Sequence, residues 1–234
     1  MGENPHKKGE KPPLFFWQYI CNHFYILILI CISIFVLPFN NQNNMPETVF
    51  SILLGIGLAA SVGFRIFVPL FALSIASYYG IIPLNENWQW IGSTAAMITL
   101  GIATIVEIGA YLIPWLDNLL DTIAVPLAAI AGTAVMLSTM ADLDPVVTWS
   151  LAIIAGGGTA TAIKSSTSTT RLASTATTGG LANPVVSTVE SGTSIIMSIL
   201  AFLWPPLAII FVIIILWLLF KVFKWFRPRK ESLP

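Results

Sequence analysis

Residues 164–190 have the sequence KSSTSTTRLASTATTGGLANPVVSTVE, which is rich in Ser, Thr and Gly. Two apolar runs flank it, Val147–Ile163 and Ser191–Trp204. A polar backbone interrupted by Gly and Pro is tolerated at membrane depth only when it is buried in protein or lines a water-filled cavity. The sequence therefore predicts a break between two membrane helices, enclosed by the fold, that forms a polar internal site.

The composition is that of a membrane protein. Of the 234 residues, 56% are hydrophobic and only 9% are charged, whereas soluble domains have about 25% charged residues. Several apolar runs are of spanning length and do not alternate, which predicts a polytopic all-α membrane protein rather than a barrel. The net charge is zero, so we expect no nucleic-acid partner. The two Cys and two His residues form no catalytic or metal-binding pattern, so we expect neither an enzyme nor a cofactor.

The order of the apolar runs predicts six to eight crossings. We expect a disordered cytoplasmic tail (1–13), an anchor helix (14–39), a helical membrane core (47–226) and a basic cytoplasmic tail (227–234). Within the core we expect short helices at 48–60 and 66–80 around a break at 61–65, a full span at 91–113, an amphipathic link at 114–123, and spans at 124–141, 147–163, 191–204 and 207–226.

The distribution of the eleven Lys and Arg residues predicts the topology. Lys precedes the first span, and both Lys and Arg follow the last, so both termini should be cytoplasmic and the number of crossings even. The short pair 48–80 must then be a re-entrant hairpin or two short spans. This model places Arg65, Lys164 and Arg171 toward the cytoplasmic side. We expect a multi-pass membrane protein with both termini in the cytoplasm.

An internal repeat is also possible. The segments 48–113 and 147–226 both contain a helix, a break and further helices, and both breaks have small residues, a Gly and a following Pro. Under the even-crossing topology the halves would be related by an axis along the membrane normal. The alternative is that small residues, Gly and Pro are simply frequent in membrane helices.

Five charged residues are candidates for chemistry. Inserting Arg65 costs at least about 2.5–3.5 kcal/mol, so it needs a partner or water. It could coordinate an anion or a lipid head group, or form a structural ion pair. With Lys164 and Arg171 it should lie at the depth of Glu107 and Glu190. The two acids could couple protons or ions, or they could belong to a static salt-bridge network.

The segment 175–183 offers the groups that would hold a ligand. Its hydroxyl, backbone and amide candidates are Thr177, Thr178, Gly179, Gly180 and Asn183. Free N–H groups at a helix start bind anions, and Asn183 before a Pro is a typical helix start. The alternative is that these small residues only permit close helix packing. We favour a site, because packing alone does not require a long polar break.

Other polar motifs have simpler interpretations. Asp144 before Pro145 predicts a helix N-cap. Asp117 and Asp121, spaced i, i+4 on the amphipathic link, predict a solvated face. The run Gly156–Gly158 predicts close helix contact.

Three stretches together resemble the bacterial integral-membrane family called domain of unknown function 4126. They are GIGLAASVGFRIFVPLFAL (55–73), DLDP (142–145) and STATTGGLANPVVS (174–187). The resemblance covers about residues 48–204. It implies that Arg65, the polar break and the DLDP loop form one shared unit, and it implies no activity.

The leading hypothesis is a transporter or channel-like protein for a small polar or anionic solute, or for an anionic lipid head group. Arg65, Lys164 and Arg171 would attract the ligand, the 175–183 backbone would hold it, and Glu107 and Glu190 would couple protons. The alternative is a structural or assembly subunit of a larger membrane complex. Membrane lipids are expected partners, and a homo-oligomer or partner subunits are possible ones.

Overall fold

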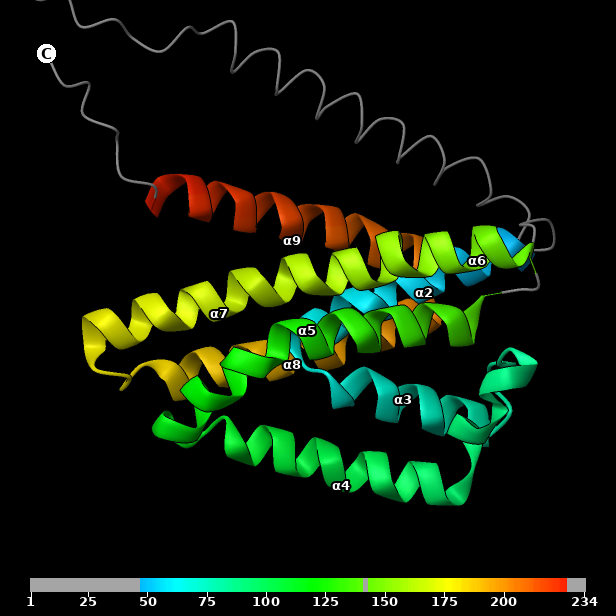
Figure 1. Cartoon of the computed structure of the whole chain (residues 1–234), viewed down its shortest axis with the longest axis horizontal. Helices are drawn as coiled ribbons and strands as arrows, with labels where there is room; N and C mark the ends of the chain where they lie inside the picture. The colour runs from blue at the N-terminus through cyan, green and yellow to red at the C-terminus, as the bar shows by residue number, and fades with distance from the viewer. Residues whose placement is uncertain (1–46, 141–142, 227–234) are drawn as a thin grey trace, which may run out of the picture. The chain divides into compact units, whose positions relative to one another are not determined.

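The computed structural model describes residues 47–140 and 143–226. The expected N-terminal tail, anchor helix and basic C-terminal tail lie outside these residues. The described part is all-helical and contains no strand. Its elements are α2 (Glu47–Phe64), α3 (Phe67–Tyr78), η1 (Glu86–Gly92), α4 (Thr94–Ala110), α5 (Pro114–Thr139), α6 (Pro145–Leu151), η2 (Ala152–Gly157), α7 (Gly158–Thr178), α8 (Asn183–Leu203) and α9 (Pro205–Phe226) (Figure 1).

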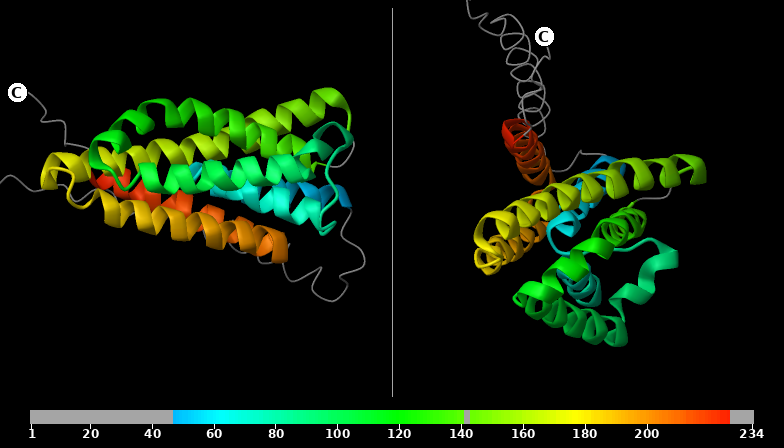
Figure 2. Two further views of the ribbon diagram at one scale, coloured as in Figure 1. Left: turned by 90° about the horizontal axis from the view of Figure 1, so that it is seen from below. Right: turned by 60° about the vertical axis from the view of Figure 1, so that its left-hand side comes forward.

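The long helices run back and forth along one common direction (Figures 1 and 2). Helices α4 and α7 end, and helices α5 and α8 begin, at the same end of the bundle. We call it the Tyr111 end, after the residue that follows α4. The other end, where η1 lies, is the η1 end. Four described helical segments are long and apolar enough to cross a membrane, or five if η1 and α4, which are bent by 65°, count as one span. This agrees with the expected class, an all-α protein with membrane-spanning helices.

Helix α2 is the centre of the described bundle. It packs against α5, α7, α8 and α9, and Leu54, Leu58 and Val62 are at most 1% exposed. Polar contacts also hold it: the Ser61 hydroxyl lies 2.7 Å from that of Ser198 and donates to the Ser194 carbonyl at 2.7 Å. The second half of α2 is thus enclosed by the bundle, whereas Val49 and Phe50 in its first turn are exposed.

A hairpin of α2 and α3 enters the bundle and turns back before reaching the Tyr111 end. Both its start and its finish lie at the η1 end (Figure 1). The predicted break lies slightly later than expected, at Arg65 and Ile66, since 61–64 still belong to α2. The choice between a re-entrant hairpin and two short spans stays a prediction, since α2 is itself long and apolar enough to cross a membrane.

The expected link at 114–123 and the expected short span at 124–141 are one helix, so that division was wrong. Helix α5 runs unbroken for 26 residues from Pro114, which occupies its first turn, and it continues through Pro126. Proline is favoured at the first helical position because its missing N–H would have no partner there. The span expected at 91–113 corresponds to α4, which begins at Thr94 because Ser93 caps it through the Ala96 N–H, while Ile91 and Gly92 belong to η1.

The polar stretch at 164–190 is mostly helical, so the long predicted break was wrong. Helix α7 continues to Thr178, and several of its hydroxyls donate to carbonyls one turn earlier, as Thr169 does to Ser165 and Thr170 does to Ser166. Because carbonyl groups of the same helix accept hydrogen bonds from these hydroxyls, a Ser/Thr-rich segment can remain helical. The actual break is a short turn, in which Gly179 and Gly180 have positive φ angles of 64° and 87°.

Close packing of α5 against η2 confirms the prediction for the glycine run. A Cβ on Gly132 would lie 2.8 Å from the Gly156 carbonyl oxygen, and one on Gly156 would lie 2.6 Å from that of Gly132. The backbones therefore approach so closely that neither position has room for a side chain. The segments of the proposed repeat run in matching order (Figure 1), but the first break lies inside the bundle and the second at its end. The repeat stays a prediction.

Candidate functional site

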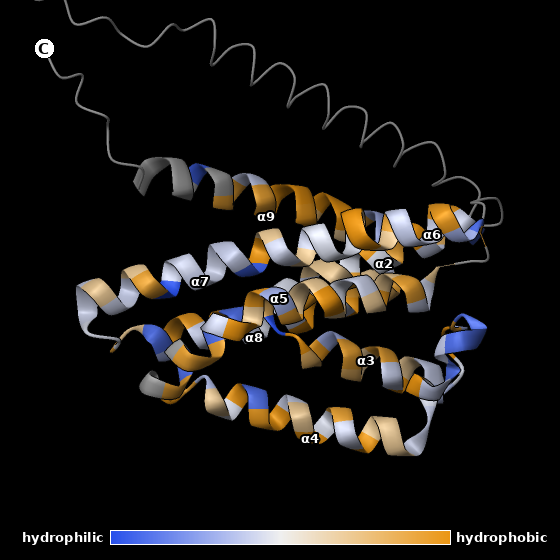
Figure 3. Ribbon diagram, in the orientation of Figure 1, coloured by the Kyte–Doolittle hydropathy of each residue, from blue (hydrophilic) through white to orange (hydrophobic). Residues whose placement is uncertain are grey.

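Charged side chains are buried together at the Tyr111 end. They come from α4, α5, α7, α8 and the α2–α3 break, and hydrophilic ribbon lies inside the bundle where α5, α7 and α8 approach (Figure 3). Three are cations and four are acids: Arg65, Lys164, Arg171, Glu107, Asp117, Asp121 and Glu190. We call this set, with Tyr111, the charge cluster. The structure brings together all five charged residues that the sequence singled out and adds two carboxylates to them.

Arg171 is the best-partnered cation of the charge cluster. Its Nε donates to Glu190 at 3.1 Å, its Nη2 to the other oxygen of Glu190, and its Nη1 to Asp117. Asp121 lies 4.0 Å away. A buried ion pair is tolerated only when the hydrogen bonding is nearly complete, and this guanidinium meets that condition. Arg171 therefore ties α5, α7 and α8 together.

Arg65, in the break between α2 and α3, has hydrogen-bond acceptors for only some of its donors. Its Nε donates to the Ser191 hydroxyl at 3.0 Å, and its Nη2 donates to the Ser187 carbonyl at 2.9 Å and to the Ser187 hydroxyl. Among the described residues, no acceptor is in reach of Nη1, although the side chain is fully buried. A buried donor without an acceptor is costly, which indicates room for a further acceptor.

Lys164 has an ion-pair partner but no hydrogen bond among the described residues. Its Nζ lies 3.8 Å from Asp121, and the residue is fully buried. An ammonium group has three donors, and here they lack acceptors. Lys164 and Arg65 thus share the property that distinguishes them from Arg171: a buried positive charge with unused hydrogen-bonding capacity.

Tyr111 lies against all three cations. Its ring centroid is 4.2 Å from the Cζ of Arg65, 4.8 Å from the Nζ of Lys164 and 4.2 Å from the Cζ of Arg171. The hydroxyl donates to Asp121 at 3.3 Å. Burial raises the pKa of the Tyr111 phenol, so the ring stays neutral and keeps its proton for this bond. The face of an aromatic ring attracts cations, so Tyr111 partly stabilises three buried charges.

Asp117 and Asp121 do not form the solvated face that their spacing predicted. Asp117 is fully buried, and Asp121 lies beside Lys164 and Arg171. The i, i+4 spacing does put them on one face of α5, but that face points inward. The sequence analysis also missed Tyr111. The available signal was its spacing, since it follows Glu107 by four residues.

Glu107 has a structural contact that the sequence did not predict. Its two carboxylate oxygens accept from the backbone N–H groups of Ile66 (2.8 Å) and Phe67 (3.0 Å). These groups begin α3, where a helix has free donors and a positive dipole end. Glu107 thus fastens α4 to the hairpin, and both of its oxygens are engaged.

The residues of the 175–183 segment are divided between the interior and the surface. Asn183 is buried, and its amide donates to Asp117 (2.8 Å) and Thr175 (3.0 Å). Its Oδ1 accepts no hydrogen bond within the described chain. Gly180 is buried as well, but Thr177, Thr178 and Gly179 are exposed at the turn. The structure therefore places Asn183 in contact with the charge cluster and leaves those three residues outside it.

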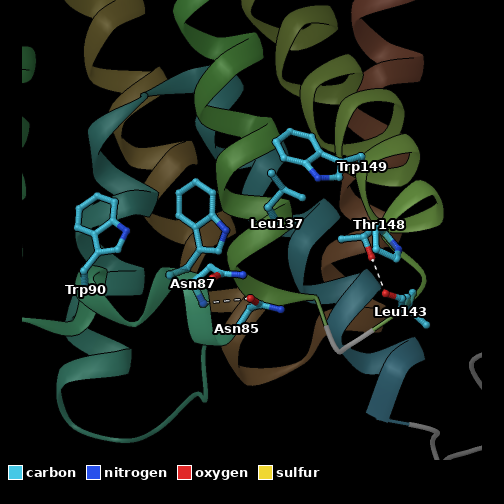
Figure 4. A pocket seen from close by; sticks show the side chains of 9 residues that line it. Asn85, Asn87, Trp90, Leu137, Leu143, Thr148 and Trp149 are labelled. Carbon is cyan, nitrogen blue, oxygen red and sulfur yellow. Dashed lines mark hydrogen bonds between the residues drawn. The ribbon is translucent and has the colours of Figure 1, made fainter.

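A separate hollow lies at the η1 end. This cavity of about 580 Å³ is lined by residues of η1, α5 and α6 and by Asn85 and Leu143, which lie just before η1 and α6. Figure 4 shows Trp90 and Trp149 on opposite sides of it, with Leu137 between them, and Asn85 and Asn87 nearby. Aromatic side chains with polar tips are typical of membrane–water interfaces.

Asp144 caps α6 through the Val146 N–H, as predicted.

Within the described ranges, no three His, Cys, Asp or Glu side chains are grouped so that they could hold a metal ion. Fold and site together define an all-helical protein with helices apolar enough to span a membrane, a hairpin of α2 and α3, and a buried charge cluster. The chain matches the family model described as "Domain of unknown function (DUF4126)" over residues 52–225 and belongs to that family. No curated protein and no solved structure matches it.

Proposed function

We propose that this chain is a membrane transporter for a small polar or anionic solute, and that the solute binds in the charge cluster. The observation that supports this most directly is the pair of cations with unused donors, Arg65 Nη1 and Lys164 Nζ. An entering anionic or polar group would supply the missing acceptors. The Oδ1 of Asn183 could accept from a donor on the same solute.

The charge balance supports a division of roles within the cluster. Arg171 is committed to Asp117 and Glu190, and Glu107 to the start of α3. Lys164 then faces the looser carboxylate, Asp121, and both Arg65 and Lys164 keep donors without an acceptor. With three cations and four acids in the cluster, the unused donors favour a hydrogen-bond acceptor such as an anion, and a proton taken up with it would keep the charge of the cluster constant.

Asp121 is the best candidate for proton coupling. Its contacts are long: 3.3 Å to the Tyr111 hydroxyl, 3.8 Å to Lys164 and 4.0 Å to Arg171. Glu107 and Glu190, the residues expected from the sequence, have shorter contacts, to the start of α3 and to Arg171. If Asp121 took up a proton as an anion arrived, the total charge of the cluster would stay constant.

The topology that fits this proposal has six crossings in the bacterial inner membrane. Five are α4, α5, the continuous α6–α7 segment, α8 and α9, the sixth is the expected anchor helix, and the hairpin does not cross. The Tyr111 end would then face the cytoplasm, together with both termini. Because the cations of the cluster are fully buried, this conformation would be an occluded one, and transport would require the helices around Arg65 to open.

The test is a flux assay in proteoliposomes loaded with the pH dye pyranine. Small monocarboxylates and phosphate are added outside, and internal acidification is recorded. The wild type should acidify with at least one anion, and Arg65→Ala should lower the initial rate at least tenfold while melting normally. Lys221→Ala, which removes an exposed cation stacked on Trp217, is the matched control and should keep the rate. If Arg65→Ala and Lys164→Ala fold and still acidify the liposomes at the wild-type rate, the proposal is contradicted.

A structural or assembly subunit is the second candidate. The complete pairing of Arg171 and the double cap by Glu107 favour it, since both are static contacts that fix helices in place. A subunit of this kind should co-purify with a partner at fixed stoichiometry. Arg65→Gln should then leave the assembly intact, and no anion should be transported.

A further inference from the structure

An apolar cavity adjoins the charge cluster. It has a volume of about 320 Å³ and is lined by residues of α3, α4 and α5 and the α2–α3 break. Nine of the eleven lining residues are apolar, and the two polar ones are Glu107 and Tyr111, both members of the cluster. Ligand pockets of about 300–1,000 Å³ with few polar groups are typical binding sites for small molecules.

The hairpin of α2 and α3 explains why this space exists. Helices α4 and α5 diverge from the turn after Tyr111, and α3 lies between them only toward the η1 end (Figure 1). Because α3 begins at Phe67, inside the bundle, it does not fill the space next to the turn. The cavity therefore follows from the position of the break that also places Arg65.

The cavity opens sideways, between α4 and α5. Three of its lining residues are partly exposed: Val106 (63%), Ile123 (50%) and Leu127 (42%). They belong to the apolar outer surface of helices that could span a membrane. Such an opening would face lipid tails, and an apolar chain could enter through it without crossing water.

The polar wall of the cavity is the ring of Tyr111. The Cζ of Arg65 lies 4.2 Å and the Nζ of Lys164 4.8 Å from the centre of that ring. Both oxygens of Glu107 already accept hydrogen bonds from the backbone of α3. The donors without an acceptor that lie against the Tyr111 ring are those of Arg65 and Lys164.

We infer that the substrate of this site is an anionic amphiphile from the lipid phase. Its charged group binds Arg65 and Lys164, and its apolar chain occupies the cavity between α4 and α5. This inference rests on the proposed function and specifies its substrate class. A free anion would use the same cations, but it would gain nothing from the adjoining apolar cavity.

The experiment compares two ligands with the same head group, ethyl phosphate and decyl phosphate. Binding is measured by titration calorimetry on the full chain in nanodiscs of neutral phosphatidylcholine, and the signal of empty nanodiscs is subtracted. We expect decyl phosphate to bind at least tenfold more tightly. Arg65→Ala should weaken both ligands at least tenfold.

A variant that fills the cavity tests whether the decyl group of decyl phosphate binds there. Ala103→Trp should abolish the advantage of decyl phosphate and leave ethyl phosphate unchanged. Val106→Trp serves the same purpose if Ala103→Trp does not fold, as judged by its melting curve.

The outcomes separate the two proposals. If both phosphates bind equally and Arg65→Ala weakens both, the amphiphile inference is overturned and the proposed function stands. An advantage of decyl phosphate that survives a folded cavity-filling variant also overturns it, because the chain then binds elsewhere. If neither phosphate binds, or if Arg65→Ala changes nothing, both proposals fail.

Discussion

Replacing Arg171 by Leu tests whether the charge cluster holds the helices together. The substitution keeps an apolar side chain on α7 but removes the cation that joins Glu190 and Asp117. Both carboxylates stay buried, since Glu190 is 4% and Asp117 0% exposed. Of the remaining cations, Lys164 already pairs with Asp121 and Arg65 donates to Ser187 and Ser191.

The expected cost follows from the geometry. Breaking a buried pair by removing one partner costs about 3–5 kcal/mol, because the remaining charge is left without compensation. Two carboxylates lose the same partner here, so the free energy of unfolding should fall by at least about 3 kcal/mol. At roughly 2–4 °C per kcal/mol for a chain of this size, the melting temperature should drop by about 6–20 °C.

The measurement is thermal unfolding in detergent, followed by tryptophan fluorescence. The compensating variant Arg171→Leu/Asp117→Asn/Glu190→Gln removes the stranded charges as well and should regain most of the loss. Arg171→Lys keeps the charge but loses the planar guanidinium that binds two carboxylates, so its melting temperature should lie between those of the wild type and Arg171→Leu. A loss below about 1 kcal/mol, or no rescue by the triple variant, would refute the view that Arg171 fixes α5, α7 and α8.

Three further predictions concern the packing around the site. Glu107→Leu removes both acceptors from the start of α3 and should cost about 1–3 kcal/mol. Glu107→Gln keeps one acceptor and should cost less, and hydrogen exchange at the first amides of α3 should rise in the same order. Gly132→Ala would place a Cβ 2.6 Å from that of Ala160 and should lower stability by about 1–3 kcal/mol. Gly109→Ala is the control, because a Cβ at Gly109 would have no atom within 4 Å. Equal melting temperatures of Gly132→Ala and Gly109→Ala would contradict the close approach of α5 and η2. Ser61→Ala removes contacts to two α8 serines and should cost only about 0.6–1.7 kcal/mol in an unfolding titration, and a larger loss would show that the hydroxyls act as a coupled network.

Much of the fold could be predicted from local sequence. The apolar runs predicted the long helices, and the short lengths of 48–60 and 66–80 predicted a hairpin around Arg65. Asp144 before Pro145 predicted the start of α6. These predictions depend on length, composition and capping chemistry, which neighbours in the sequence decide.

The polar stretch shows where local reasoning failed. Ser, Thr and Gly indicated a break from 164 onward, but the hydroxyls of α7 bond to their own helix, and only Gly179 and Gly180 take the backbone out of it. Composition alone cannot distinguish a polar helix packed inside a protein from a polar loop, because hydroxyls can be satisfied in both.

The sequence by itself determined which residues are charged, which runs are apolar and which positions share a helical face. Only the tertiary structure decided where those faces point. It turned Asp117 and Asp121 inward, placed Tyr111 against three cations and occupied Glu107 with the start of α3. The physical reason is that periodicity relates residues of one helix, whereas ion pairs and cavities depend on how several helices pack against one another.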